Sequence, residues 1–107
     1  MSPRGILLAL ILAPLGLASL PAHAATVQIV MDKLVFAPAE TQAKVGDTIE
    51  WINKDILAHT ATATAGDAWN VIIAPSKTEK LVLQKAGTID YFCKYHPNMK
   101  GRLVVAP

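Results

Sequence analysis

The chain of 107 residues has little net charge and a single cysteine. A formal charge of +2 is too small to indicate binding to nucleic acid or to an anionic membrane surface. Because Cys93 is the only cysteine, an internal disulfide is excluded. The sequence also lacks internal repeats, low-complexity tracts and any segment with a sustained helical period. These absences favour one small domain that is built from strands.

The first 24 residues have the three parts of a secretory signal peptide. Arg4 contributes to a basic start, residues 5–20 are apolar, and residues 22–24 (Ala-His-Ala) match a small-residue cleavage site. The apolar stretch is shorter than the roughly 20 residues that span a bilayer, which disfavours an uncleaved anchor. We therefore predict a signal peptide over residues 1–24, a mature domain over residues 25–107, a periplasmic location and no stable membrane insertion after processing.

The mature part is a series of short segments in which apolar and polar residues alternate, with turn residues every eight to twelve positions. This pattern predicts an all-β fold, a Greek-key antiparallel β-sandwich of seven to eight strands. A domain of this size has a small core, and a bound metal is one way to stabilise it. The strand-like segments are residues 26–31, 34–36, 41–45, 49–53, 59–64, 69–73, 78–83, 88–93 and 102–105.

Cys93, His96 and Met99 follow one another at steps of three, where a predicted strand ends. A thiolate with imidazoles in one plane and a weakly bound thioether along the axis is a soft ligand set that suits copper. The second imidazole would come from His59, because His23 lies in the predicted signal peptide. The residues therefore predict a copper site whose metal ligands are His59, Cys93, His96 and Met99.

Two other uses of these residues are weaker. Zinc also binds cysteine and histidine, but zinc sites complete their shell with cysteine, histidine, carboxylate or water and not with a thioether. Cys93 acting as a nucleophile beside His96 would need an orienting carboxylate or an oxyanion-hole motif, and neither is apparent. We therefore expect that the protein is not an enzyme.

Two stretches of the chain resemble the cupredoxin family. Residues 87–105, GTIDYFCKYHPNMKGRLVV, resemble its carboxyl-terminal copper loop, and the short Cys-x-x-His-x-x-Met spacing is most similar to the amicyanin type within the plastocyanin-like group. Residues 45–53, VGDTIEWIN, with His59 six positions later, resemble the strand and the first histidine ligand of the family. The resemblance covers nearly the whole mature chain. It implies the cupredoxin fold, with His59 and Cys93 on neighbouring strands at one end of the sandwich.

The resemblance also implies a function. The chain would be a monomeric, periplasmic type 1 copper protein that carries single electrons between redox proteins, such as a dehydrogenase and a c-type cytochrome. One copper per chain would cycle between Cu(I) and Cu(II), His96 would reach the surface through an apolar patch, and Phe92 would offer a second electron path. The alternative is a copper carrier or sequestering protein without a redox partner, which is disfavoured because the sequence has no methionine- or histidine-rich tract.

Asn53 and Thr60 are candidates for residues that hold the ligands in place. Thr60 follows His59 at a position where the family often carries an asparagine that ties the two ligand-bearing segments together, and a hydroxyl has a shorter reach. Tyr95 occupies a position where the amicyanin type commonly has proline. A phenol there makes the rim around His96 bulkier and more polar.

Overall fold

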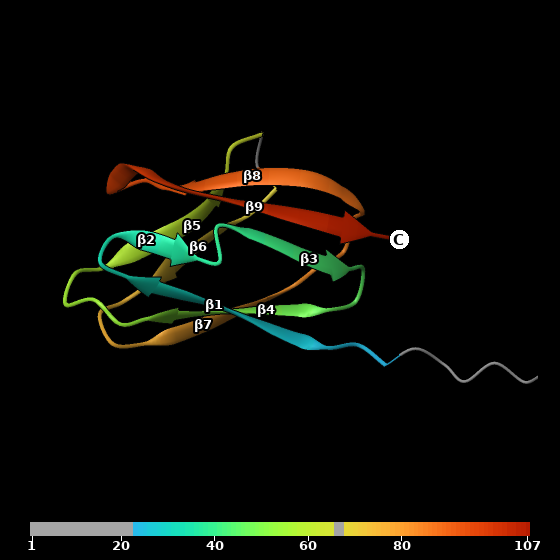
Figure 1. Cartoon of the computed structure of the whole chain (residues 1–107), viewed down its shortest axis with the longest axis horizontal. Helices are drawn as coiled ribbons and strands as arrows, with labels where there is room; N and C mark the ends of the chain where they lie inside the picture. The colour runs from blue at the N-terminus through green and yellow to red at the C-terminus, as the bar shows by residue number, and fades with distance from the viewer. Residues whose placement is uncertain (1–22, 66–67) are drawn as a thin grey trace, which may run out of the picture.

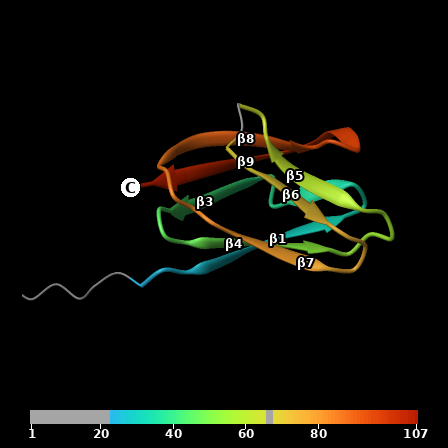
Figure 2. The same ribbon diagram turned by 180° about the vertical axis from the view of Figure 1, so that it is seen from behind.

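The structure, a computed structural model, describes residues 23–65 and 68–107. Over these residues the chain forms nine β-strands in two sheets that face each other (Figure 1, Figure 2). Residues 1–22 of the predicted signal peptide lie outside the described part. No helix among the described residues is long and apolar enough to cross a membrane. The strands are β1 (Thr26–Asp32), β2 (Val35–Ala37), β3 (Glu40–Lys44), β4 (Thr48–Asn53), β5 (His59–Ala63), β6 (Asn70–Ile73), β7 (Thr78–Val82), β8 (Gly87–Cys93) and β9 (His96–Ala106).

The predicted all-β sandwich is confirmed, with nine strands over the described residues in place of the seven to eight predicted. Its strand pairing is mixed. One sheet has the order β2-β1-β4-β7 and the other the order β3-β9-β8-β5-β6. Most neighbours are antiparallel, as predicted, but β1 pairs with β4 and β3 pairs with β9 in parallel. A short hairpin forces antiparallel pairing, whereas strands that become neighbours through longer connections are free to run in the same direction. Both parallel pairs consist of strands that are not consecutive in the chain.

The core lies between the sheets and is centred on aromatic rings. Trp51 and Tyr91 are fully buried with ring centroids 5.7 Å apart, and Phe36 contacts Tyr91 at 4.7 Å. Gly101 pairs with Tyr91 across β8 and β9, and a Cβ atom at Gly101 would lie 2.3 Å from Tyr91 Cζ. Only glycine therefore fits opposite this ring. Burial raises the pKa of Tyr91 to about 12, because the phenolate would lose its hydration.

The order of strands brings three predicted ligands to one end of the molecule. Strand β8 lies between β5 and β9 in the five-stranded sheet. Cys93 is the last residue of β8, while His59 and His96 are the first residues of their strands. Because β8 is antiparallel to both neighbours, all three residues lie at the same end, together with the β1–β2 turn (Figure 1).

The last strand starts earlier than the sequence pattern predicts. We expected a strand from residue 102, but β9 begins at His96, immediately after the two-residue turn that follows Cys93. The pairing of β8 with β9 begins with Cys93 opposite His96, but the next pair is Phe92 opposite Lys100. Residues 97–99 are the extra residues of this irregularity. The predicted loop is thus a short hairpin turn followed by a bulged strand.

Candidate metal centre

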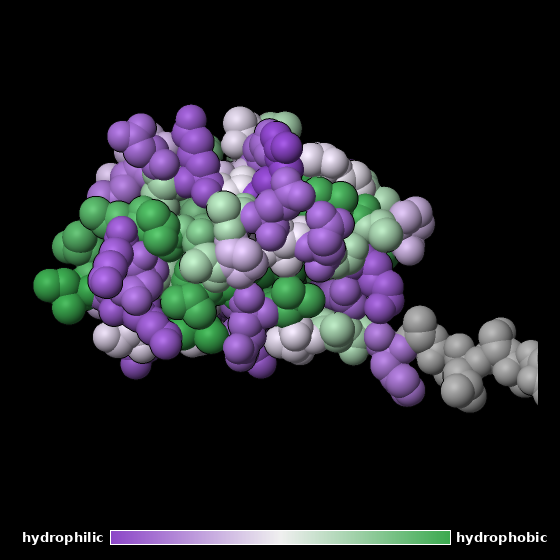
Figure 3. Space-filling view, in the orientation of Figure 1, coloured by the Kyte–Doolittle hydropathy of each residue, from purple (hydrophilic) through white to green (hydrophobic). Residues whose placement is uncertain are grey.

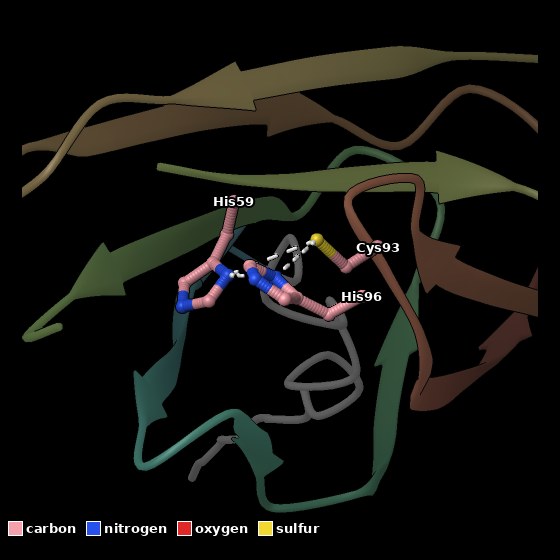
Figure 4. A group of neighbouring side chains, drawn as sticks. All are labelled: His59, Cys93 and His96. Carbon is pink, nitrogen blue, oxygen red and sulfur yellow. Dashed lines mark hydrogen bonds between the residues drawn. The ribbon is translucent and has the colours of Figure 1, made fainter. Parts of the chain in front are cut away.

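His59, Cys93 and His96 form a compact triangle of donor atoms (Figure 4). The distance between the two Nδ1 atoms is 3.2 Å. Cys93 Sγ lies 3.7 Å from Nδ1 of His59 and 3.6 Å from Nδ1 of His96. His59 and Cys93 are fully buried and His96 is half-buried. Three residues that the sequence analysis selected from two separate segments therefore point at one another.

The size of this triangle fits a metal ion. A point equidistant from the three donor atoms lies about 2 Å from each of them, close to the roughly 2.0–2.3 Å bonds that nitrogen and sulfur ligands make to zinc-sized ions. One thiolate and two imidazoles are also the strong ligands of a blue-copper site. Both the distances and the chemistry of the donors fit copper.

Asp55 holds the far side of the His59 ring. Its Oδ2 atom lies 2.7 Å from His59 Nε2, and its carboxylate accepts hydrogen bonds from the amides of Lys33 and Leu34. Burial acts to raise the pKa of Asp55, but the hydrogen bonds from His59 and the two amides outweigh it, so this pKa is lowered. A charged carboxylate favours the His59 tautomer with its proton on Nε2. The lone pair of Nδ1 then faces Cys93 and His96.

Thr60 ties the segment of His59 to the segment of Cys93. Its amide donates a hydrogen bond to Cys93 Sγ at 3.3 Å. Its hydroxyl accepts a hydrogen bond from the amide of Lys94 at 2.8 Å, and it lies 2.9 Å from the Thr62 hydroxyl. The threonine side chain therefore links the segments that carry His59 and Cys93, despite its short reach. A hydrogen bond from a backbone amide to Sγ favours the thiolate form of a cysteine.

Asn53 stabilises the loop before His59, and its hydrogen bonds reach none of the three donor atoms. Its amide group donates to the carbonyl of Leu57 at 2.8 Å and to the carbonyl of Ile73 at 3.2 Å. Its carbonyl oxygen accepts a hydrogen bond from the amide of Asp55 at 2.9 Å. Asn53 therefore fixes the backbone that carries Asp55, one step further from the metal centre than we predicted.

Met99 lies in the irregular segment of β9, three residues after His96. Its side chain is 3% exposed and belongs to the core cluster that also contains Cys93. The structure thus places Met99 in the interior, on the strand that begins with His96. Its role as the axial ligand remains a prediction.

Comparison with known proteins agrees with this geometry. The profile of the cupredoxin-like domain family matches residues 5–105. The chain is a cupredoxin. Amicyanin from Paracoccus versutus is 30% identical over 97 residues, which cover 86% of this chain and 72% of that protein. Plastocyanin from Scenedesmus fuscus is 31% identical over 85 residues, which cover 67% of this chain and 87% of that protein.

Solved structures support the same assignment. The Cu(I) form of an amicyanin variant superposes with a TM-score of 0.70 at 31% identity, and the match covers 79% of this chain and 85% of that one. Cupredoxins of this kind are electron carriers and not enzymes, and the type 1 copper of the family is the cofactor that the triangle of His59, Cys93 and His96 fits.

Sequence reasoning missed Asp55. A carboxylate four residues before a histidine is a common arrangement, and nothing in the spacing indicates that the same carboxylate also meets Lys33 and Leu34. The only available signal is the general rule that metal-bound histidines have a hydrogen-bond partner on the second ring nitrogen. That rule says that a partner exists, but the fold identifies it.

Proposed function

We propose that this cupredoxin is a periplasmic type 1 copper protein that carries single electrons between protein redox partners. The observation that carries the proposal is the triangle of one sulfur and two nitrogen atoms around a point about 2 Å from each. When bound, copper supplies a one-electron couple between Cu(I) and Cu(II). The residues that would hold copper are His59, Cys93 and His96, with the thioether of Met99 as a weaker axial donor.

The residues around the site restrict its movement. Asp55 holds the ring of His59, the amide of Thr60 holds the sulfur of Cys93, and the hydroxyl of Thr60 holds the backbone after Cys93. The burial of His59 and Cys93 excludes water from two of the donors. A site whose ligands are held in this way reorganises little when its charge changes, which suits electron transfer.

The surface around the site fits a protein partner. Figure 3 shows hydrophobic surface at the end of the molecule that carries the β1–β2 turn and the loop before β5. The exposed fractions are 89% for Ile56, 47% for Leu57 and 53% for Tyr95. Clustered exposed apolar side chains mark interaction sites. We infer that a redox partner, such as a dehydrogenase or a c-type cytochrome, docks here and exchanges electrons through the half-buried His96, and that Phe92 provides a second path.

A contact at the start of the domain supports the proposed export. The amide of Ala25 donates a hydrogen bond to Asp47 Oδ1 at 2.9 Å, and the Asp47 residue is only 3% exposed. Cleavage after Ala24 would turn this amide into a charged amino group facing a carboxylate, and charge-assisted hydrogen bonds are the stronger kind. Intact-mass analysis of the exported protein should give a chain that starts at Ala25.

The decisive experiment is the colour of the purified protein with Cu(II). A copper–thiolate bond gives strong absorption in the visible, so the protein should be intensely blue and Cys93→Ser should be colourless. A colourless wild-type complex would refute the type 1 site. Fast electron self-exchange would support the electron carrier, whereas ready loss of copper to a chelator with sluggish reduction would support a copper carrier instead.

The axial ligand is tested separately. Met99→Gln replaces a weak thioether with a harder oxygen donor, which stabilises Cu(II), so the reduction potential should fall. Voltammetry of the two proteins makes the measurement. An unchanged potential would mean that Met99 is a packing residue.

A further inference from the structure

The turn between β1 and β2 has an unusual backbone for its residues. Lys33 and Leu34 have φ values of 56° and 63°, and Asp32 pairs with Val35 on either side of them. Two successive left-handed residues form the tight hairpin turn that asparagine and glycine prefer. Lysine and leucine pay a steric penalty in this conformation because their Cβ atoms crowd the backbone. The turn therefore needs a stabilising contact from outside the hairpin.

Asp55 provides that contact. The amide of Lys33 donates to Oδ1 at 2.7 Å and the amide of Leu34 donates to Oδ2 at 3.0 Å. Successive amides that converge in this way form a concave site for an anion, here a carboxylate from a loop more than 20 residues away. Both oxygen atoms are thereby fixed. The carboxylate has a defined orientation before its contact with any metal ligand is considered.

The third contact leads to the metal centre. Oδ2 of Asp55 lies 2.7 Å from His59 Nε2, and the His59 side chain is fully buried. A ring held at Nε2 turns Nδ1 toward the other two donors. His59 Nδ1 lies 3.7 Å from Cys93 Sγ and 3.2 Å from His96 Nδ1. A chain of hydrogen bonds thus runs from the surface turn, through one carboxylate, to the ring that faces the metal.

We propose that Asp55 is a positioning residue that couples the β1–β2 turn to His59, so that the backbone of the turn determines which nitrogen of His59 faces the metal. The metal readout of this proposal rests on the proposed copper function, but the coupling itself is a property of the metal-free protein. Partners on the second nitrogen of a ligand histidine typically change metal affinity by about 10–100-fold when they are removed.

The first experiment is Asp55→Ala, with Asp32→Asn as the matched control. Asp32 carries the same charge beside the same turn but makes none of these three hydrogen bonds. In NMR spectra of the metal-free protein, Asp55→Ala should change the chemical shifts of the Lys33 and Leu34 backbone amides. It should also remove the signal of a slowly exchanging proton on His59 Nε2. Copper affinity should fall by about 10–100-fold. The control should leave all three observations unchanged.

Asp55→Asn separates the two halves of the coupling. The carboxylate accepts from Lys33 at Oδ1 and from both Leu34 and His59 at Oδ2, whereas an amide keeps a single acceptor oxygen. That oxygen can serve Lys33, or Leu34 with His59, but not all three. Copper affinity should follow the Nε2 proton of His59 and not the Lys33 amide: it should stay near the wild-type value if the Nε2 proton is kept and fall if this proton is lost. This variant also keeps the test valid if Asp55→Ala fails to fold.

Leu34→Gly tests the contribution of the turn. Glycine adopts a positive φ without the steric penalty. In the Asp55→Ala background it should recover much of the lost stability, because the turn no longer needs the carboxylate, but it should not recover copper affinity or the Nε2 proton.

An intact Nε2 proton and unchanged copper affinity in Asp55→Ala would overturn the proposal and reduce Asp55 to a clamp on the turn. Suppose that the metal-free spectra of the variant change as expected while the wild-type protein forms no blue Cu(II) complex. In that case the coupling through Asp55 stands and the proposed copper function fails.

Discussion

The two ends of the sandwich each contain an aspartate that accepts two backbone hydrogen bonds. At the metal end, Asp55 binds the amides of Lys33 and Leu34. At the opposite end, in the connection between β3 and β4, Asp47 binds the amides of Ala25 and Lys44 (Figure 1). Hydrogen bonds from the backbone are the main cause that lowers the pKa of Asp47, and they also act to lower the pKa of Asp55.

The third partner of each carboxylate differs. Asp47 has the ammonium group of Lys44 at 3.8 Å, on a side chain that is 40% exposed. Asp55 has the imidazole of His59 at 2.7 Å, on a side chain that is fully buried. Solvent screens the first contact, so Asp47 mainly holds backbone segments together. The same local arrangement therefore stabilises the fold at one end and orients a proposed metal ligand at the other.

The largest expected effect comes from a change in the core that both ends share. Gly101→Ala places a Cβ atom against Tyr91, which Phe36 and Trp51 hold in place. We expect a loss of about 3 kcal/mol in the free energy of unfolding, measured in urea. The loss should be smaller in a Tyr91→Leu background. An unchanged unfolding midpoint would mean that the core around Tyr91 can move, and that it does not connect the two ends rigidly.

Asp47→Asn should damage the fold and leave the site unchanged. The melting temperature should fall by on the order of 10 °C, while the visible spectrum of the copper form stays the same. Because the pKa of Asp47 is lowered in the folded state, its contribution is present above the unfolded carboxyl pKa and disappears as pH falls through the folded value. The two proteins should therefore converge in acid.

Asp90→Asn is the control for Asp47→Asn, because its ion pair with Arg102 is exposed and should contribute little. A spectral change in Asp47→Asn would show that the two ends are not independent.

Thr60→Ala should affect the site more than the fold, in contrast to Asp47→Asn. Removal of the hydroxyl leaves the amide of Lys94 without its acceptor, which costs about 1 kcal/mol, and it loosens the link between the segments of His59 and Cys93. Copper should dissociate faster and the visible band should shift, with only a small change in stability. Thr60→Ser keeps the hydroxyl and is the control. Equal copper dissociation rates in the alanine variant and the wild type would mean that the Thr60 hydroxyl does not stiffen the site.

The smallest effect near neutral pH concerns Tyr91. Its pKa of about 12 exceeds the ordinary value of 10.0, so its contribution to stability is complete below pH 10 and is lost as pH rises through 12. Absorbance of the phenolate in the ultraviolet, followed with pH, should show one group ionising near pH 12. Tyr91→Phe should lack this step. Ionisation of Tyr91 near its ordinary pKa would indicate that water reaches the core between the two ends.

Most of the fold could be predicted because strand patterns are local. Alternation over residues 49–53 predicted a strand, and in β4 the alternate residues Ile49, Trp51 and Asn53 are buried. The start of β9 was placed too late, because residues 97–99 form an irregularity that breaks the two-residue period. The parallel pairs could not be predicted, because direction depends on which strands become neighbours.

The chemistry of the site could be predicted from the chain alone. Cys93, His96 and Met99 are close in the chain, and a thiolate, an imidazole and a thioether carry their preference for copper wherever they lie. How the site residues are held depends on the packing of the strands and turns. The position of β8 between β5 and β9 brings His59 to Cys93, and the meeting of the β1–β2 turn with the loop before β5 makes Asp55 the partner of His59. The two differ in the length of chain that they involve. The chemistry of a ligand belongs to a single side chain. A hydrogen bond between segments more than 20 residues apart forms only after the sheets have packed.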